Sequence, residues 1–359
     1  MTAFATAREA RRPRGERPSR GIRTCRRAAG LGGFARRLGQ VVFVVWAAFT
    51  GAFLALYRMP SDPVTLMLAQ RSGGPNVVVD PVQQAALRAE YGFDQPAWRQ
   101  YGTLLGRALR GDFGTSVQTG QSVRQLLTDA LPRTTQLAAA ALLVAVPLGV
   151  AVPLAAAHIR RRRIRNLLDA LPAAGVSIPS FWLGILLLQG LSFHWALFPA
   201  TGNGGLRSLV LPAITLGLPA AAVIAQVLGR SLRSDLGSAY VELARARGAS
   251  QSWIVLRHVL RNAAFPALTV TGLLVANLFG GAVIVETVFA RAGLGQVTVA
   301  AVTNEDLPVL LGLVVLAAMI YAVLSLLVEA LYPVLDPRVR RDRGDASHRA
   351  PTTRVRKAV

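Results

Sequence analysis

Long apolar blocks separated by polar and basic segments dominate the chain. Six of them are about 20 residues long and contain few or no charged residues, so each can cross about 30 Å of hydrocarbon as a helix. They occupy residues 38–57, 136–157, 171–193, 209–229, 263–285 and 307–328. The pattern predicts an all-α membrane protein with six transmembrane helices. Prolines inside the blocks do not argue against helices, because neighbouring helices in a membrane can satisfy the freed backbone groups.

The segments between the blocks predict the organisation of the rest of the chain. A basic tail precedes the first block, and a long segment separates the first block from a five-helix core that contains one long connection. A second basic tail ends the chain, and the composition of both tails is typical of disorder. In residue numbers these are the tail 1–37, the first helix 38–57, the segment 58–135, the core 136–335 with its connection 230–262, and the tail 336–359.

Arginine distribution predicts the orientation in the membrane. The segments 1–37, 158–169, 230–262 and 336–359 together hold 30 Arg and Lys against 8 Asp and Glu. The connections on the other side hold 10 Arg against 9 acidic residues. Because basic residues accumulate in cytoplasmic segments, we expect both termini in the cytoplasm and segment 58–135 outside it.

Composition and motifs exclude several classes of protein. A net charge of +22 suggests nucleic-acid binding, but the basic clusters flank apolar runs, so we expect contact with membrane lipid and no nucleic-acid partner. Cys25 is the sole cysteine and the four histidines lack ligand spacing, which predicts no metal site. The chain also lacks a phosphate-binding G-x-x-x-x-G-K-[ST] motif, so we expect no cofactor and no ATPase activity.

The connection 230–262 is the most informative segment of the sequence. Ser238 can cap a short helix over residues 239–247, and Gly248 can end that helix in a left-handed conformation. Tyr240, Ala244 and Arg247 would then share one side of the helix. From the residues alone, a helix that enters a groove of a partner protein and an amphipathic linker on the inner leaflet are equally compatible with this pattern.

Polar residues within or next to the apolar blocks are further candidates. Glu286 follows the fifth block, and we expect it near water at the outer end, either bonded to the Gly-rich turn at Gly293 and Gly295 or part of an outer gate. Gln226 lies inside the fourth block, where a hydrogen bond between helices or a place along a solute pathway would explain it.

Several motifs, in order, resemble those of one family of membrane transporters. Glu242, Leu243 and Ala244, with Gly248 four residues later, resemble the E-A-A-x-x-x-G loop of type I ABC importer permeases. Other segments resemble the dipeptide, oligopeptide and nickel permeases within that class, and together they cover about residues 36–340. They are LRGDFG at 109–114, SIPSFWLG at 177–184, LPAITLG at 211–217, LRHVLRNA at 256–263, GGAVIVETVF at 280–289, GLG at 293–295 and LDPR at 335–338.

The resemblance implies a type I ABC importer permease fold with a long extracytoplasmic segment after the first helix, in a bacterial inner membrane. It implies a permease that forms half of a translocation pathway for di- or oligopeptides. The implied partners are a second permease in a heterodimer, two cytoplasmic ATPase subunits and an extracytoplasmic substrate-binding protein. Glu242, Ala244 and Gly248 would belong to the helix that contacts the ATPase, with Tyr240 and Arg247 beside them.

The sequence departs from the family pattern at three points. Leu243 replaces the middle alanine of the loop, His258 and the residues after it replace an I-x-L-P ending, and Ser61 stands where a glycine is common. Two alternatives to the peptide importer remain at this point. One is an importer of nickel or another small solute within the same family. The other is a stand-alone secondary transporter or membrane scaffold, for which the sequence offers no inverted repeat.

Overall fold

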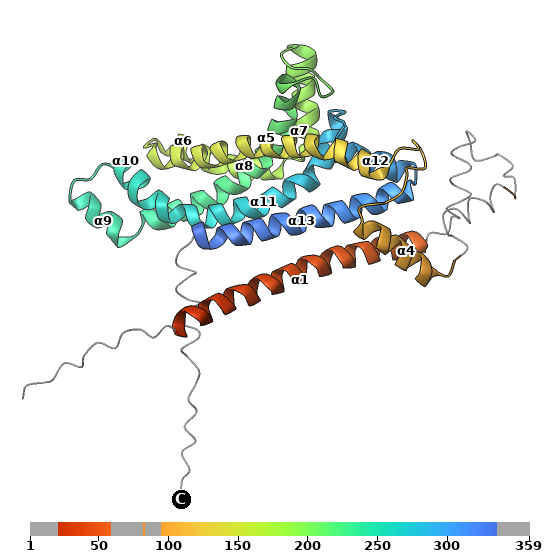
Figure 1. Ribbon diagram of the computed structural model, residues 1–359. Coiled ribbons are helices and arrows are strands. Elements are labelled where there is room, and N and C mark those ends of the chain that lie inside the picture. Colours follow the sequence, from red (N-terminus) through yellow and green to blue (C-terminus); the bar gives the residue numbers. More distant parts are fainter. Residues whose placement is uncertain (1–20, 59–81, 83–94, 336–359) are drawn as a thin grey trace, which may run out of the picture. The chain divides into compact units, whose positions relative to one another are not determined.

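The computed structural model describes residues 21–58, 82 and 95–335. Contacts divide the chain between Phe43 and Val44 into two units. The described part of the first unit is the beginning of helix α1 (Gly21–Tyr57). All the elements that position the candidate site belong to the second unit (Figure 1).

Helices account for most of the described residues, which confirms the all-α prediction. Strand-type pairing among these residues is limited to one isolated bridge between Thr115 and Ser122. After α1 the helices are α4 (Ala97–Leu109), α5 (Val123–His158), α6 (Arg162–Ser177), α7 (Ser180–Leu187), the π-helix η1 (Leu188–His194), α8 (Leu206–Leu236), α9 (Ala239–Ala246), α10 (Gln251–Ile254), the π-helix η2 (Val255–Val259), α11 (Leu260–Val288), α12 (Leu294–Thr303) and α13 (Leu307–Leu335).

Five helices in the described ranges are long and apolar enough to cross a membrane, and a sixth is reached if one bent helix pair counts as a span. The predicted blocks other than the third overlap these helices over all or nearly all of their length. Prolines inside α5, α8 and α11 do not end them. The five are Arg36–Ala55, Val123–His158, Leu206–Leu236, Gln251–Val288 and Leu307–Val328.

The third block, 171–193, is not one continuous helix, although the bent pair that contains it can still count as the sixth span. The chain bends by 103° between α6 and the α7–η1 segment. Ile178 and Pro179 both adopt extended backbone angles at the bend. A proline disfavours helical angles in the residue before it, so Ile178 ends α6 and Pro179 precedes a new helix. Gly184 then lets α7 pack closely against Thr215 of α8.

Two helices begin at other residues than the apolar blocks do. Helix α5 begins at Val123 and so includes residues 123–135, which precede the second block. Helix α6 begins at Arg162, so the arginine-rich connection before the third span is short. Within segment 58–135, the described residues also form helix α4.

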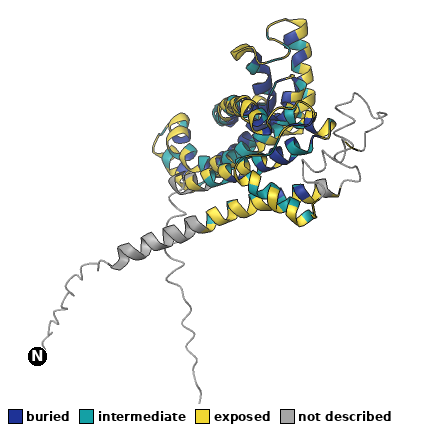
Figure 2. Cartoon of the chain, turned by 45° about the vertical axis from the view of Figure 1, so that its right-hand side comes forward, coloured by how far each residue is buried: buried dark blue, intermediate teal, exposed yellow. Residues whose placement is uncertain are grey.

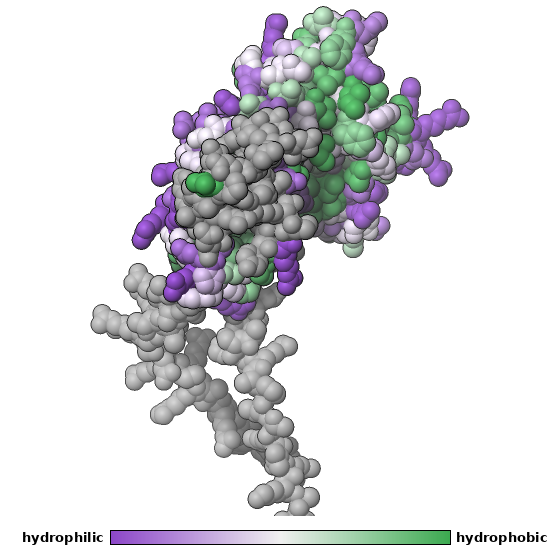
Figure 3. All heavy atoms as spheres, turned by 90° about the vertical axis from the view of Figure 1, so that its right-hand side faces the viewer, coloured by the Kyte–Doolittle hydropathy of each residue, from purple (hydrophilic) through white to green (hydrophobic). Residues whose placement is uncertain are grey.

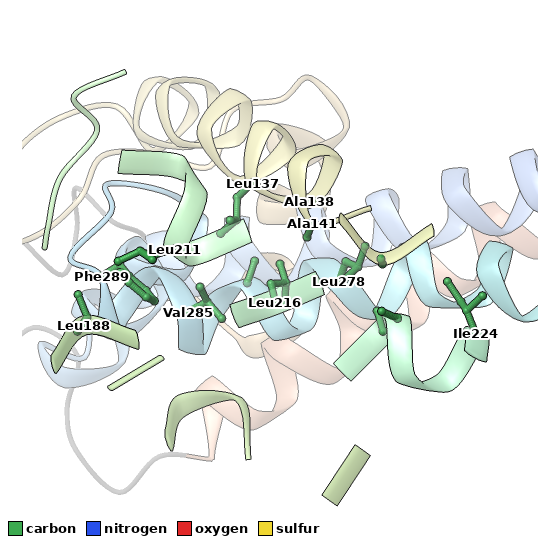
Figure 4. Packing of buried hydrophobic residues seen from close by; sticks show 14 residues of the cluster. Leu137, Ala138, Ala141, Leu188, Leu211, Leu216, Ile224, Leu278, Val285 and Phe289 are labelled. Carbon is green, nitrogen blue, oxygen red and sulfur yellow. The ribbon is translucent and has the colours of Figure 1, made fainter. Parts of the chain in front are cut away.

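Helix α8 forms the centre of the bundle and packs against α5, α6, α7 and α11. Its contact with α5 is close because glycines face it. A Cβ atom on Gly217 would lie 2.6 Å from the Ala141 carbonyl oxygen, and one on Gly149 would lie 2.7 Å from Ile224 Cβ. Small residues allow this approach of helix backbones in membranes. Leu137, Leu211 and Phe289 are among the side chains that fill the adjoining core (Figure 4).

Apolar side chains cover much of the outside of these helices as well. Figure 2 shows exposed residues along the outward sides of the helices, with buried residues between them. Leu143, in the middle of α5, is 76% exposed. In the view of Figure 3, apolar residues gather on part of the surface and hydrophilic residues lie around them. An apolar exterior of this extent is typical of helices that face hydrocarbon, since soluble monomers rarely expose large apolar patches.

Candidate functional site

The candidate site is built on α9, the short helix between α8 and α10. Ser238 occupies the N-cap position with extended backbone angles, as predicted, but its side chain makes no capping bond to α9. Its hydroxyl instead donates to the Asp235 carbonyl oxygen at 2.5 Å. At the other end, Gly248 has a φ of +83° and its N–H donates to the Arg245 carbonyl oxygen at 2.9 Å. The predicted left-handed stop is therefore confirmed, and α9 ends at Ala246.

One apolar residue anchors α9 to the bundle. Val241 is fully buried and belongs to a cluster with Leu228 and Leu232 of α8, Ile254 of α10 and Val259 of η2. Ala244 is half-buried against the same cluster. Because Val241 occupies the inner face, its sequence neighbours Tyr240 and Glu242 are exposed. A displacement of α9 would therefore act directly on α8 and on the start of the η2–α11 helix.

The outward face of α9 borders a hollow of about 430 Å³. Tyr240, Ala244, Arg247 and Gly248, four of the predicted site residues, line it together. Glu242 lies in the first turn of α9 and is exposed, but it is not part of the lining.

Four residues of the hollow extend the predicted set, Ala249 and three with larger side chains. Leu243, one of the residues that depart from the family pattern, lines the hollow and is 54% exposed. Trp253 and His258 form the opposite side, and their rings lie 4.4 Å apart between centroids. Sequence reasoning missed Trp253 and noted His258 only as a departure from the family pattern. The Ser250 cap, whose Oγ accepts from the Trp253 N–H at 3.3 Å, is the signal that could have located Trp253.

Exposed charged residues also lie on these helices. Arg247 lines the hollow, Arg245 and Glu242 are exposed on α9, and Arg257 is exposed on η2. Apart from Arg247, the hollow is lined mainly by aromatic and aliphatic side chains. It is suited to hold an apolar side chain of another protein while the arginines attract acidic groups around it.

A second candidate group lies at the far end of α11. Glu286 is completely buried, so the expectation that water is close to it was wrong. Its carboxylate accepts hydrogen bonds from the Thr134 hydroxyl and from the Gly295 N–H, both at 2.7 Å. The expected bond to the Gly-rich turn is thus present. Thr134, which sequence reasoning did not identify, also accepts from the Leu294 N–H at 2.8 Å and so joins α5 to the turn.

The two glycines of this turn are required by its close contacts with α11. A Cβ atom on Gly293 would overlap Glu286 Oε1, and one on Gly295 would overlap the Val283 Cα. Arg291 is also buried, 3% exposed, and its Nη1 donates weakly to the Ser208 carbonyl oxygen at 3.3 Å. Burial lowers the pKa of this guanidinium, and the nearby Glu286 carboxylate opposes that shift. Hydrogen bonds therefore join this turn to α5, α8 and α11.

The described residues contain no group of three or more His, Cys, Asp or Glu side chains that could hold a metal ion. Gln226 makes the interhelical bond expected of it, since its Nε2 donates to the Pro172 carbonyl oxygen of α6 at 3.2 Å.

Comparisons with known proteins agree with this geometry. Residues 126–341 match the family described as the binding-protein-dependent transport system inner membrane component. The dipeptide transport system permease protein DppB of Lactococcus lactis subsp. cremoris (strain MG1363) is 32% identical over 85% of this chain and 98% of its own length. DppB of Escherichia coli (strain K12) is 32% identical over 85% of this chain and 97% of its own.

The fold also matches a solved structure. A chain of the MetNI methionine ABC transporter, in an inward-facing conformation, aligns with 59% of this chain and 97% of its own length, with a TM-score of 0.51 and 18% identity. In this family the membrane subunits are not catalytic, and ATP hydrolysis and solute capture belong to separate subunits. The chain belongs to the binding-protein-dependent transport system inner membrane components, and it is a multi-pass permease subunit of an ABC importer with the type I fold.

Proposed function

We propose that this permease forms half of the translocation pathway of an importer for di- or oligopeptides. The relatives described above are named as dipeptide permeases, and they align over nearly their entire length. The proposed partners are a second, different permease, two cytoplasmic ATPase subunits and an extracytoplasmic binding protein that delivers the peptide.

We further propose that α9 is the segment that contacts the ATPase. The observation that carries this proposal is the exposed hollow formed by Tyr240, Leu243, Arg247 and Trp253 around a helix with a single buried anchor. Figure 1 shows α9 and α10 at one end of the bundle and α12 at the other. The end that carries α9 also carries the arginines at the start of α6 and the end of α8, which supports a cytoplasmic location for it. Both termini would then be cytoplasmic.

Val241 provides the route by which ATP-driven movement would reach the pathway. When the two ATPase subunits close, α9 would move with them. Because Val241 packs against α8 and η2, the movement would tilt α8 and α11 as rigid bodies. The hydrogen bonds of Glu286 to Thr134 and to the Gly293–Gly295 turn would keep the opposite end of α11 attached to α5. We propose that this attachment supports the outer gate.

Substitution of Gly248 tests the role of α9. Alanine at Gly248 must adopt a φ of +83°, which costs about 1 kcal/mol or more and shifts the end of α9. Gly237 is the matched control, because it also flanks α9 but has a φ of −87° that alanine adopts freely. In proteoliposomes with all subunits, Gly248→Ala should lower both solute uptake and binding-protein-stimulated ATP hydrolysis several-fold, whereas Gly237→Ala should leave both unchanged. Equal behaviour of the two variants would contradict the proposal.

The substrate assignment needs a separate test. Labelled dipeptide should accumulate in the same vesicles when the cognate binding protein is present, and unlabelled dipeptide should compete with it. Accumulation of nickel with no dipeptide uptake would favour the small-solute alternative and leave the role of α9 intact.

A further inference from the structure

A second cavity, of about 170 Å³, lies between α5, α6 and α8. It is separate from the hollow beside α9, with which it shares no lining residue. Its lining is divided by chemistry. Arg230, Arg233 and Asp169 contribute charge, whereas Leu168 and Pro172 are among the residues that form an apolar wall.

The charged side of the cavity is organised around Arg233. Its Nη1 donates to Asp169 Oδ1 at 2.7 Å, which joins α8 to α6. The Arg233 side chain is 55% exposed, and a guanidinium carries five N–H donors, so it can bind a further acceptor. Arg230 lies one helical turn earlier on the same face of α8 and is also exposed. Together with Asp169, the two arginines give the ionisable lining a net charge of +1.

The cavity is held open by contacts that fix its walls. Gln226 Nε2 donates to the Pro172 carbonyl oxygen at 3.2 Å and keeps α8 at a set distance from α6. Gly229 places no side chain in the space, and its Cβ position lies 3.6 Å from both Pro153 of α5 and the Arg233 guanidinium. The walls therefore come from three helices whose mutual positions are set by packing and hydrogen bonds.

We infer that this cavity binds the phosphodiester headgroup of an anionic phospholipid. A guanidinium matches the geometry of phosphate oxygens, and basic pockets between membrane helices are suited to anionic headgroups. The net charge of +1 balances the single negative charge of a phosphodiester, whereas inorganic phosphate carries more. The apolar wall matches the glycerol and first acyl carbons of a lipid and offers nothing to a soluble anion. A bound headgroup would bridge α6 and α8 beside the Arg233–Asp169 pair.

Native mass spectrometry of the detergent-purified importer, with all its subunits, tests this assignment. Phosphatidylglycerol should be retained in preference to phosphatidylcholine, and millimolar inorganic phosphate should not displace it. The double variant Arg230→Gln/Arg233→Gln should weaken retention about thirtyfold, and Arg230→Gln alone, which leaves the Arg233–Asp169 pair intact, about fivefold.

Arg161→Gln/Arg163→Gln is the matched control. It removes the same charge from exposed positions on α6 and its N-cap that do not line the cavity, and it should change retention less than about threefold. The thermal unfolding of each variant in lipid-free detergent shows that it is folded. Equal loss in both double variants, equal retention of the two lipids, or displacement by inorganic phosphate would each overturn the inference.

Discussion

Thr134 provides a sharp test of how the outer end of the permease is held together. Its hydroxyl donates to Glu286 and accepts from the Leu294 N–H, so it links α5 to α11 and to the turn before α12. Thr134→Val keeps the shape of the side chain and removes both bonds. The change leaves a backbone N–H and part of a carboxylate without partners in a site where Thr134 is 1% exposed.

The size of the effect can be bounded. A lost bond to a charged carboxylate and an unsatisfied buried N–H together cost about 4 kcal/mol by the values for soluble proteins. Hydrogen bonds between membrane helices average only about 0.6 kcal/mol, which sets a lower bound of about 1 kcal/mol for two. We therefore expect Thr134→Val to lower the free energy of unfolding by about 1–4 kcal/mol.

Thr135 is the matched control on the same helix. It is exposed, and its hydroxyl donates only to the Leu131 carbonyl oxygen one turn earlier. Thr135→Val should change stability by less than about 0.5 kcal/mol. The measurement is equilibrium unfolding of both variants in mixed detergent micelles, followed by circular dichroism. If the two variants unfold at the same denaturant concentration, the Glu286 network does not stabilise the outer end and the reasoning is refuted.

Two further predictions concern positions outside the α9 hollow. Gly295→Ala should destabilise the protein by about 1–3 kcal/mol, because the new Cβ would overlap the Val283 backbone. Gly280→Ala on α11 is the control and should not destabilise the protein, because the space around Gly280 is open. Similar yields and melting temperatures for the two variants would argue against the tight turn. Arg107 donates to Asp112 at 2.9 Å and holds the pKa of that carboxyl below its ordinary value of 3.8. The stabilisation that the ionised Asp112 provides is present above pH 3.8 and disappears as the pH falls through the lower pKa of the folded protein. In a series of melting temperatures against pH, Asp112→Asn should therefore lose less stability on the acid side than the unsubstituted protein. An unchanged profile would contradict this.

The helical spans could be predicted because length and apolar character are local properties of the sequence. The bend in the third span could not be predicted in the same way. Pro179 breaks its helix, whereas Pro147 and Pro212 lie inside continuous ones. The difference is tertiary, because α7 packs across α8 and α11 through Gly184, and no local pattern reveals that contact.

The candidate site shows the same division. Gly248 and the short helix before it follow from local backbone preferences, so they were predictable. The partner of Glu286 was not, since Thr134 lies 152 residues earlier in the chain. Hydropathy alone favours water beside a carboxylate at the end of a span, and only the fold reveals a buried set of donors. His258 lies in η2, where its ring packs beside Trp253 of α10, and sequence patterns do not indicate where a helix will adopt that wider turn.

Photo-crosslinking within the assembled importer tests the central proposal, contact between α9 and the ATPase, most directly. A photoreactive amino acid would replace Leu243, which is 54% exposed beside the hollow, or Val302, which is 59% exposed on α12 at the other end of the bundle. Irradiation should join the permease to the ATPase subunit from position 243 and not from position 302. Absence of an ATPase adduct from position 243, or equal adducts from both positions, would contradict the account.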